Sequence, residues 1–293
     1  MILITGWTGN TGRLVVEMLR ERFPDRTLVG VARSPAAPTV PNLIVETADL
    51  SRESEVASLF ERYQFHTIVH TANIRYSPVL MRLSEARGVG HIIFVHTAAI
   101  YSVYQEYRAL YRQIESAILD NPDRRVPYTI LRPTMIYSDH RDHNVHKLVR
   151  VLARTPVFPV FGGGSARMQP VHAEDLAAAI VRCVDNPKVL NRAYDLSGGS
   201  VVTYREMLGM IADALGRRIV FVPVPQRAAE ALVGLYNRVA KNPRITVEQV
   251  RRLREDKSCP HEAAAADLDF RPRPFAEGLR EEIALLRREG LVR

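Results

Sequence analysis

Short apolar runs alternate with amphipathic stretches along the first half of this chain. Six runs have the length and composition of β-strands, and they cover residues 2–5, 27–32, 43–47, 67–71, 91–96 and 128–132. The stretches between them carry apolar residues at helical spacing, over residues 11–22, 54–63, 78–87 and 106–119. Strands that alternate with helices in this way indicate βαβ units, whose right-handed crossovers place helices on both faces of a parallel sheet. The pattern therefore predicts an α/β protein with a doubly wound parallel sheet.

The second half is less regular and predicts a smaller unit. Helices are expected over residues 144–153, 175–184, 203–215, 226–239, 246–254 and 275–288, and strands over residues 194–196 and 219–224. Thr203 and Glu206 have the spacing of a capping box, and Gly216 ends that helix. Residues 156–164 are rich in proline and glycine and are interpreted as a loop. No Ser/Gly linker separates the halves, so we expect the two units to pack directly together.

Composition narrows the class of protein. The 293 residues are 46% hydrophobic and 25% charged, as in ordinary soluble domains, and no apolar run approaches the roughly 20 residues that span a bilayer. The chain starts without the basic region of a signal peptide, and Cys183 and Cys259 form no disulfide framework, so a cytoplasmic protein is expected. The net charge of +8 comes from scattered arginines, since only four of the 40 basic residues are lysines: Lys147, Lys188, Lys241 and Lys257. No basic stripe is visible, and no nucleic-acid partner is predicted.

A glycine-rich turn follows the first predicted strand and opens the first predicted helix. It reads Gly6-Trp7-Thr8-Gly9-Asn10-Thr11-Gly12. In a βαβ unit, such glycines permit a tight turn, close approach of the backbone to a pyrophosphate, and close packing of helix on strand. The helix N-terminus then offers free N–H groups to the anion. We predict that Gly6, Thr8, Gly9, Asn10, Thr11 and Gly12 bind a dinucleotide; the alternative is a glycine-rich turn without a ligand.

Several later segments extend this pattern over almost the whole chain. They are Asp49-Leu50, His70-Thr71-Ala72-Asn73, Leu131-Arg132-Pro133, the stretch from Gln169 to Asp175, and Leu268-Asp269-Phe270-Arg271-Pro272. Together with the Gly-x-x-Gly-x-x-Gly spacing they resemble the extended branch of the short-chain dehydrogenase/reductase superfamily, close to the NAD-dependent epimerase/dehydratase group. Asp269 replaces a glycine of that group's C-terminal motif.

The resemblance implies a fold, a division of the chain and further cofactor contacts. It implies a Rossmann domain over residues 1–138, to which residues 166–199 return, and a small C-terminal α/β substrate lobe made of residues 139–165 and 200–293. The additional residues expected at the dinucleotide are Asp49 and Leu50 beside the adenine, with Thr71, Ala72, Asn73 and Pro133 along the groove.

The end of the second strand indicates which dinucleotide is preferred. NAD sites usually place an acidic residue there, about 20 residues after the glycines, to hold the ribose hydroxyls. This chain has Arg33 and Ser34 at that point and no carboxylate. A guanidinium pairs well with a 2′-phosphate. The sequence therefore predicts NADP, with NAD kept open because Arg33 could equally be an ordinary surface arginine.

The expected catalytic segment departs from the family at one position. In the superfamily a Ser or Thr after the fifth strand acts with Tyr-x-x-x-Lys on the next helix, and the resemblance assigns these positions to Thr97 and Tyr107. Tyr111 stands where the lysine is expected. A phenol with a pKa near ~10 is a poor base without such help. We predict Thr97 with Tyr107 or Tyr111 at the reacting oxygen; the alternative is that both tyrosines only pack against the sheet.

Three residues are expected on the substrate side. The resemblance places the loop after the sixth strand over the nicotinamide, which gives His140 and Asn144, and it places His172 near the cleft. The histidines of residues 139–146 lack a known ligand spacing, so no metal is predicted. The function expected is an NAD(P)-dependent oxidoreductase or epimerase acting on a small hydroxyl or keto compound. Two alternatives stay open: a dinucleotide-binding redox sensor or assembly subunit with little turnover, and a sugar-nucleotide epimerase or dehydratase. No membrane partner is expected, and a homodimer is left open.

Overall fold

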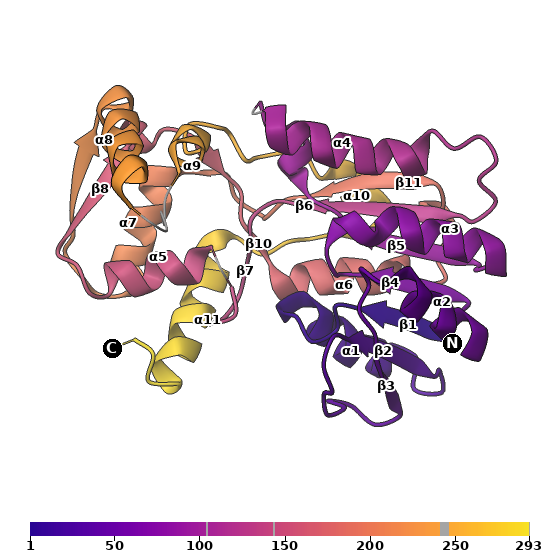
Figure 1. The fold of residues 1–293 in the computed structure, drawn as a ribbon. Helices are drawn as coiled ribbons and strands as arrows, with labels where there is room; N and C mark the ends of the chain where they lie inside the picture. Colours follow the sequence, from indigo (N-terminus) through magenta and orange to yellow (C-terminus); the bar gives the residue numbers. More distant parts are fainter. Residues whose placement is uncertain (104, 143, 241–245, 293) are drawn as a thin grey trace.

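A seven-stranded parallel sheet forms the centre of the molecule (Figure 1). The computed structural model describes residues 1–293 except 104, 143, 241–245 and 293, and it leaves the side chains of residues 105–107 undescribed. The sheet order is β11-β6-β5-β4-β1-β2-β3, and every neighbouring pair is parallel. The strands are β1 (Ile2–Thr5), β2 (Leu28–Ala32), β3 (Leu43–Thr47), β4 (Thr67–His70), β5 (His91–Val95), β6 (Tyr128–Pro133) and β11 (Arg192–Leu196).

Helices cover both faces of this sheet. One face carries α1 (Asn10–Arg22) and α6 (Ala173–Cys183), and the other carries α2 (Glu53–Arg62), α3 (Ser77–Arg87) and α4 (Gln105–Leu119). Successive residues of a strand point to opposite faces. Accordingly Ile2 and Ile4 pack in the cluster with α1 and α6, while Leu3 packs in the cluster with α2, α3 and α4. The predicted doubly wound Rossmann sheet is confirmed.

The second lobe has its own hydrophobic core. Its helices are α5 (Val145–Leu152), α7 (Tyr204–Ala214), α8 (Gln226–Val239), α9 (Val247–Arg252) and α11 (Phe275–Arg288). Residues of α5, α7 and α11 meet in one buried cluster that includes Val149, Leu208 and Leu279. The capping box predicted at the start of α7 is confirmed, since Thr203 and Glu206 each accept a hydrogen bond from the other's backbone N–H.

The interpretation of residues 156–164 as a loop is wrong. Residues Val157–Phe161 form strand β8, which pairs in parallel with β13 (Val220–Val224). Pro159 and Pro223 lie within these strands. A two-stranded ribbon leaves one edge of each strand without a partner, so a proline whose nitrogen faces outward costs no ladder hydrogen bond. The glycines follow the strand, in the 3₁₀ turn Gly162–Gly164.

Short pairings join the lobe to the Rossmann domain. Strand β9 (Arg167–Met168), in the segment expected to return to the Rossmann domain, pairs with β12 (Val202–Thr203) of the lobe. Strand β7 (Ile136–Tyr137), where the chain leaves for the lobe, pairs with β10 (Val171–His172), where it has returned. Helix α10 (Glu262–Leu268) returns to the first unit, where Ala264, Leu268 and Phe270 join the core around β11 and α6. The remaining 3₁₀ turns are Ile74–Tyr76, Ala98–Tyr101 and Pro187–Val189. In the described part of the chain, no helix has both the length and the apolar character needed to cross a membrane.

Candidate active site

Two glycines of the turn after β1 are fixed by close backbone contacts. Gly6 has φ +75°, and a Cβ added there would lie 2.7 Å from the backbone nitrogen of Ala72. A Cβ added at Gly12 would lie 2.2 Å from the carbonyl oxygen of Gly6. Both distances are shorter than real Cβ contacts, and the φ of Gly6 is one that side chains disfavour. The turn after β1 thus packs directly on the turn after β4.

The start of α1 has the features of an anion cradle. Gly9 is the N-cap, no side chain caps the helix, and the first turn holds no acidic residue. The first N–H groups of a helix have no partner inside the helix and carry the positive end of its dipole. Thr8 and Gly9 are exposed, and a Cβ on Gly9 would meet only the carbonyl oxygen of Gly6, at 3.2 Å. The cradle therefore fits the pyrophosphate of a dinucleotide.

Asn10 has a partner within the protein. Its side chain and the hydroxyl of Ser138 are joined by contacts of 2.8 and 3.0 Å. These contacts tie the first turn of α1 to the segment that follows β7. Asn10 therefore lies in the predicted cradle, where it links the Rossmann domain to the start of the lobe. Thr11, beside it, is half-buried in the same helical turn.

The other predicted cofactor residues lie at the carboxyl ends of β2, β3 and β4. Arg33 and Ser34 are exposed directly after β2. The side chain of Asp49, after β3, accepts hydrogen bonds from the backbone and hydroxyl of Ser51, and these bonds hold the pKa of its carboxyl below the usual value. The hydroxyl of Thr71, after β4, donates to the carbonyl of Thr5 at 2.8 Å. The remaining members of this set are Leu50, which is buried, Ala72, which packs on Gly6, and Asn73, which caps the turn Ile74–Tyr76.

A cavity of about 360 Å³ opens at the carboxyl ends of β5 and β6. Open α/β sheets bind ligands at this edge. One wall comes from the Rossmann domain and includes Thr97, Tyr101 and Pro133. The opposite wall is the last residue of α9 with the segment that leads on toward α10, which together we call the covering segment (residues 252–259). Its lining residues are Arg252, Glu255, Asp256, Lys257, Ser258 and Cys259.

A chain of polar contacts supports the wall formed by the Rossmann domain. The hydroxyl of Tyr101 donates to the carboxylate of Asp195 at 2.9 Å and accepts from Arg132 at 3.2 Å. Arg132 also forms an ion pair of 2.6 Å with Glu115, which His96 contacts at 3.1 Å. Arg132 and Glu115 are largely buried, with side-chain exposures of 14% and 3%. Glu115 on α4 thus anchors the ends of β5 and β6.

Burial and the neighbouring charges set the protonation states of Glu115 and Tyr101 within this set of polar contacts. Burial opposes ionisation of Glu115, but hydrogen bonds from His96 and Arg132 outweigh it and lower the pKa of the carboxyl. For Tyr101, burial and the hydrogen bond to Asp195 outweigh the nearby Arg132 and raise the pKa of the phenol to about 12. Tyr101 therefore keeps its proton at neutral pH, and that proton is directed at Asp195.

The structure brings some of the predicted site residues together. Thr97, Pro133 and Asn144 line the cavity. The hydroxyl of Thr97 accepts from the N–H of Ala99 at 3.2 Å, which fixes its side chain at the start of the turn Ala98–Tyr101. Asn144 is exposed, and its amide donates to the carbonyl of Ile136 at 3.3 Å.

Other predicted residues lie elsewhere or are not described. The side chain of Tyr107 lies outside the described residues. Tyr111 is half-buried on α4 and does not line the cavity. His140 contacts Glu289 at the end of α11, at 3.0 Å. His172 is buried, packs edge-on against Tyr137, and caps α6 by accepting from the N–H of Glu174. These two histidines are therefore held by the lobe junction and do not face the cavity.

Sequence reasoning missed the covering segment. Residues 252–259 lie more than a hundred positions from β6, and no local motif marks them. The polar chain of Tyr101, Arg132 and Asp195 was missed for the same reason, since three separate elements supply it. One signal was available: Lys257 is among four lysines in a chain whose other basic residues are arginines. Among the described residues, no group of three or more His, Cys, Asp or Glu side chains is placed to hold a metal ion.

Known proteins share this architecture. In sequence the chain is 25% identical over 270 residues to the divinyl chlorophyllide a 8-vinyl-reductase of Oryza sativa subsp. indica, which covers 82% of this chain and 65% of the relative. It is 28% identical over 124 residues to the NADH dehydrogenase (ubiquinone) 1 alpha subcomplex subunit 9 of Dictyostelium discoideum, covering 42% of this chain and 34% of the relative. The chain thus spans less than two thirds of the length of either curated relative.

A solved structure and a family profile complete the comparison. The UDP-glucose 4-epimerase of Thermotoga maritima superposes with a TM-score of 0.75 and 17% identity, over 98% of this chain and 99% of that one, which shows a shared fold. The profile of the NAD dependent epimerase/dehydratase family matches residues 2–196, the part that holds the glycine turn, all seven strands of the sheet and Thr97. The resemblance read from the sequence is confirmed: this chain belongs to the NAD dependent epimerase/dehydratase family.

Proposed function

We propose that the protein is an NAD(P)-dependent oxidoreductase that acts on a small hydroxyl- or keto-bearing molecule. The observation that carries this proposal is the cavity of about 360 Å³ between Thr97 and the covering segment. Its volume lies at the small end of the range for small-molecule sites. It adjoins the carboxyl ends of β5 and β6, on the sheet edge where the glycine turn would hold a dinucleotide. The match to a vinyl-reductase supports reductive chemistry in general and no particular substrate.

The cofactor, when bound, supplies or accepts a hydride at the substrate carbon. The residues of the chain then bind the substrate oxygen and exchange its proton. We propose that the hydroxyl of Thr97 donates a hydrogen bond to that oxygen and that a tyrosine of α4 exchanges its proton. Tyr107 is favoured over Tyr111, because Tyr111 does not line the cavity. The sequence of α4 contains no lysine that could assist the phenol. A protonated phenol is the acid that reduction of a carbonyl needs.

Activity of single variants tests this chemistry. Thr97→Ala and a phenylalanine variant of the working tyrosine are expected to lower turnover by about 10²–10⁴-fold on small aldehydes or ketones, the usual contribution of general acid–base catalysis. Tyr63→Phe is the matched control, because Tyr63 follows α2 and contacts Glu46 away from the cavity. Rates are measured from pH 6 to 9. If Tyr107→Phe, Tyr111→Phe and Thr97→Ala all retain more than a tenth of the wild-type rate, this mechanism is wrong.

We also propose that NADPH binds more tightly than NADH, because Arg33 follows β2 where a carboxylate would favour NAD. Arg33→Ala is expected to weaken NADPH binding by about tenfold or more, the loss of one charge-assisted contact, and to leave NADH binding nearly unchanged. Calorimetric titration measures both affinities. Arg271→Ala, at an arginine whose side chain is 85% exposed, controls for lost surface charge. Equal losses for the two cofactors would show that Arg33 does not read the 2′-phosphate.

A second function is a dinucleotide-binding protein with little turnover. Tyr111 at the family's lysine position favours it, as does the likeness to a protein named as a subunit of NADH dehydrogenase. Binding of NADPH without turnover on any carbonyl compound would support this reading. The third possibility, a sugar-nucleotide epimerase, predicts that purified protein retains tightly bound NAD; ready exchange of NADPH argues against it.

A further inference from the structure

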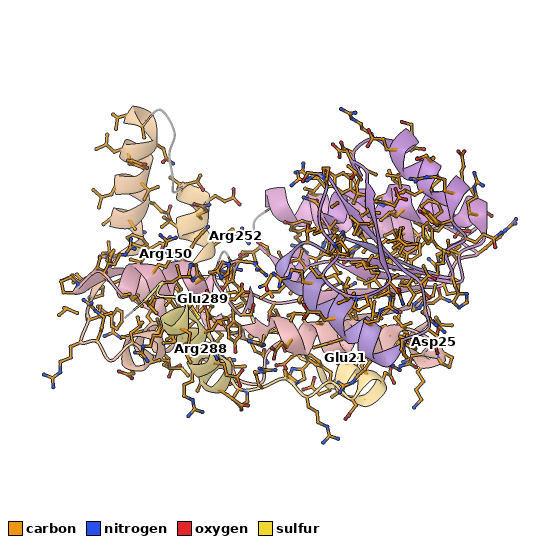
Figure 2. The ribbon with its side chains drawn as sticks, turned by 90° about the horizontal axis from the view of Figure 1, so that it is seen from below. Glu21, Asp25, Arg150, Arg252, Arg288 and Glu289 are labelled. Carbon is orange, nitrogen blue, oxygen red and sulfur yellow. The ribbon has the colours of Figure 1, made fainter. Side chains whose placement is uncertain are left out.

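The covering segment brings a lysine into the cavity that holds Thr97. Lys257 lines this cavity together with Thr97 and Tyr101, although it lies in the lobe and far from both in sequence. It is half-buried. Figure 2 shows its neighbour Arg252 on the part of the lobe that faces the Rossmann domain. The family's lysine position on α4 is taken by Tyr111, so α4 itself brings no ammonium group.

The backbone around Lys257 is held in place. Its N–H donates to the carbonyl of Arg167 at 2.6 Å, and the carboxylate of Asp256 accepts from the N–H of Arg167 at 2.7 Å. Two residues on, the N–H of Cys259 donates to the side chain of Gln169 at 3.2 Å. These contacts fix the segment against β9, so the position of the lysine stem at the cavity is set by the fold.

The carboxylates that border the cavity are engaged by other groups. Glu255 accepts from the hydroxyl of Ser102 at 2.7 Å and from the N–H of Val103 at 2.5 Å. It also lies 3.7 Å from the guanidinium of Arg252. The other lining carboxylate, Asp256, accepts from the N–H of Arg167 at 2.7 Å. Asp195, which does not line the cavity, is held by Tyr101 and Arg132. Within the described part of the chain, no carboxylate oxygen lies within 4.0 Å of the Lys257 nitrogen.

Lys257 forms no ion pair with a carboxylate of the described residues, although Glu255 is near enough to act on its charge. Burial lowers the pKa of Lys257, nearby Arg252 lowers it further, and Glu255 opposes the change. Two further groups that line the cavity keep their protons at neutral pH, since burial raises the pKa of Tyr101 and of Cys259 to about 12 each. A partly desolvated ammonium gains most from a ligand oxygen that carries negative charge.

We propose that Lys257 is a catalytic residue, whose ammonium stabilises the negative charge that develops on the substrate oxygen beside Thr97. The lobe thus supplies the cation that family members place on α4. This inference rests on the proposed function. Lys257 forms and breaks no covalent bond in this role, and the proton still comes from the tyrosine. Activity should therefore be present while the amine is protonated and should be lost as the pH rises through its pKa.

Three variants test the proposal. Lys257→Met removes the charge and keeps the length of the stem, Lys257→Arg keeps the charge, and Lys147→Met replaces an exposed lysine of the same lobe as the control. Lys257→Met is expected to lower turnover of small aldehydes by about 10²–10³-fold, as for loss of one preorganised electrostatic contact. NADPH affinity should stay unchanged in all three. Lys257→Arg should recover part of the rate and move the high-pH loss of activity upward.

A second measurement does not depend on turnover. Reductive methylation with ¹³C-formaldehyde labels only four lysines and the N-terminus, so the Lys257 signal is identified by its absence in Lys257→Met. It should titrate at lower pH than the exposed Lys147 and Lys188. It should also shift when acetate, a mimic of the charged oxygen, is added with NADPH. A Lys257 signal that titrates with the exposed lysines and ignores acetate overturns the inference, as does wild-type turnover in Lys257→Met.

The failure of the proposed function gives a different result. If the wild type binds NADPH but turns over no aldehyde or ketone, the oxidoreductase proposal fails, and the acetate titration still decides whether Lys257 contacts an anionic oxygen. If the wild type binds neither NADPH nor NADH, both proposals fail. A wild type that turns over normally, beside an equally active Lys257→Met variant, removes only the role of Lys257.

Discussion

Replacing Glu115 by alanine is expected to lower the free energy of unfolding by about 3–5 kcal/mol, the usual cost of breaking a buried ion pair from one side. The change leaves the guanidinium of Arg132 buried without the partner that it contacts at 2.6 Å. Asp195 lies 3.7 Å from the same guanidinium and can offset only part of the loss. Urea unfolding, followed by circular dichroism, measures the change.

The control is an ion pair of the same type on the surface. Glu53→Ala breaks the contact with Arg82, whose side chain is 59% exposed, and should cost far less stability than Glu115→Ala. Because Arg132 also holds Tyr101, the cavity wall should loosen in Glu115→Ala and turnover should fall with stability. A cost for Glu115→Ala as small as that for Glu53→Ala would mean that the polar chain does not anchor the ends of β5 and β6.

Gly12→Ala is expected to abolish dinucleotide binding, with an affinity loss of at least about 100-fold. The added Cβ would lie 2.2 Å from the carbonyl oxygen of Gly6, so the turn or the helix must shift. Overpacking of this kind costs about 1–3 kcal/mol in stability. The N–H groups at the start of α1 would be displaced as well and would no longer point at the expected position of the pyrophosphate. Quenching of the single tryptophan, Trp7, which lies in the turn, provides the binding measurement.

Gly209→Ala separates this effect from helix propensity. Gly209 also lies in a helix, α7, but a Cβ there would have no heavy atom within 4 Å. The substitution should stabilise the protein by up to about 1 kcal/mol, because alanine favours helix over glycine. It should leave cofactor affinity unchanged. If Gly12→Ala behaves like Gly209→Ala, the close packing of the glycine turn is not required for binding.

The sheet could be predicted from the sequence because its strands are buried on both faces. Such strands read as continuous apolar runs, and Ile2-Leu3-Ile4 is one of them. Strand β8 was missed because prolines usually interrupt strands, and here a two-stranded ribbon accommodates Pro159. Helix α10 was missed because it is only seven residues long, and its packing on β11 has no local signature.

The glycine turn and the cavity also differ in how much of each could be predicted from the sequence. The predicted cofactor cradle depends on a local motif, so Gly6, Gly9 and Gly12 could be named from their spacing. The cavity depends on contacts between distant segments, such as that between Ser102 and Glu255. No periodicity encodes such a contact. Of the residues predicted from the sequence, Thr97 and Asn144 line the cavity, as does Lys257, which was not predicted. His140 and His172 contact other residues, and their place on the substrate side stays a prediction.

The repeated passage of the chain between its two units has an evolutionary consequence. Strand β7 pairs with β10, β9 pairs with β12, and α10 returns to the Rossmann core before α11 completes the lobe. Recombination that swaps one contiguous gene segment would separate at least one of these pairs. We therefore expect the cavity to change by substitutions within the covering segment, which meets the Rossmann domain across it.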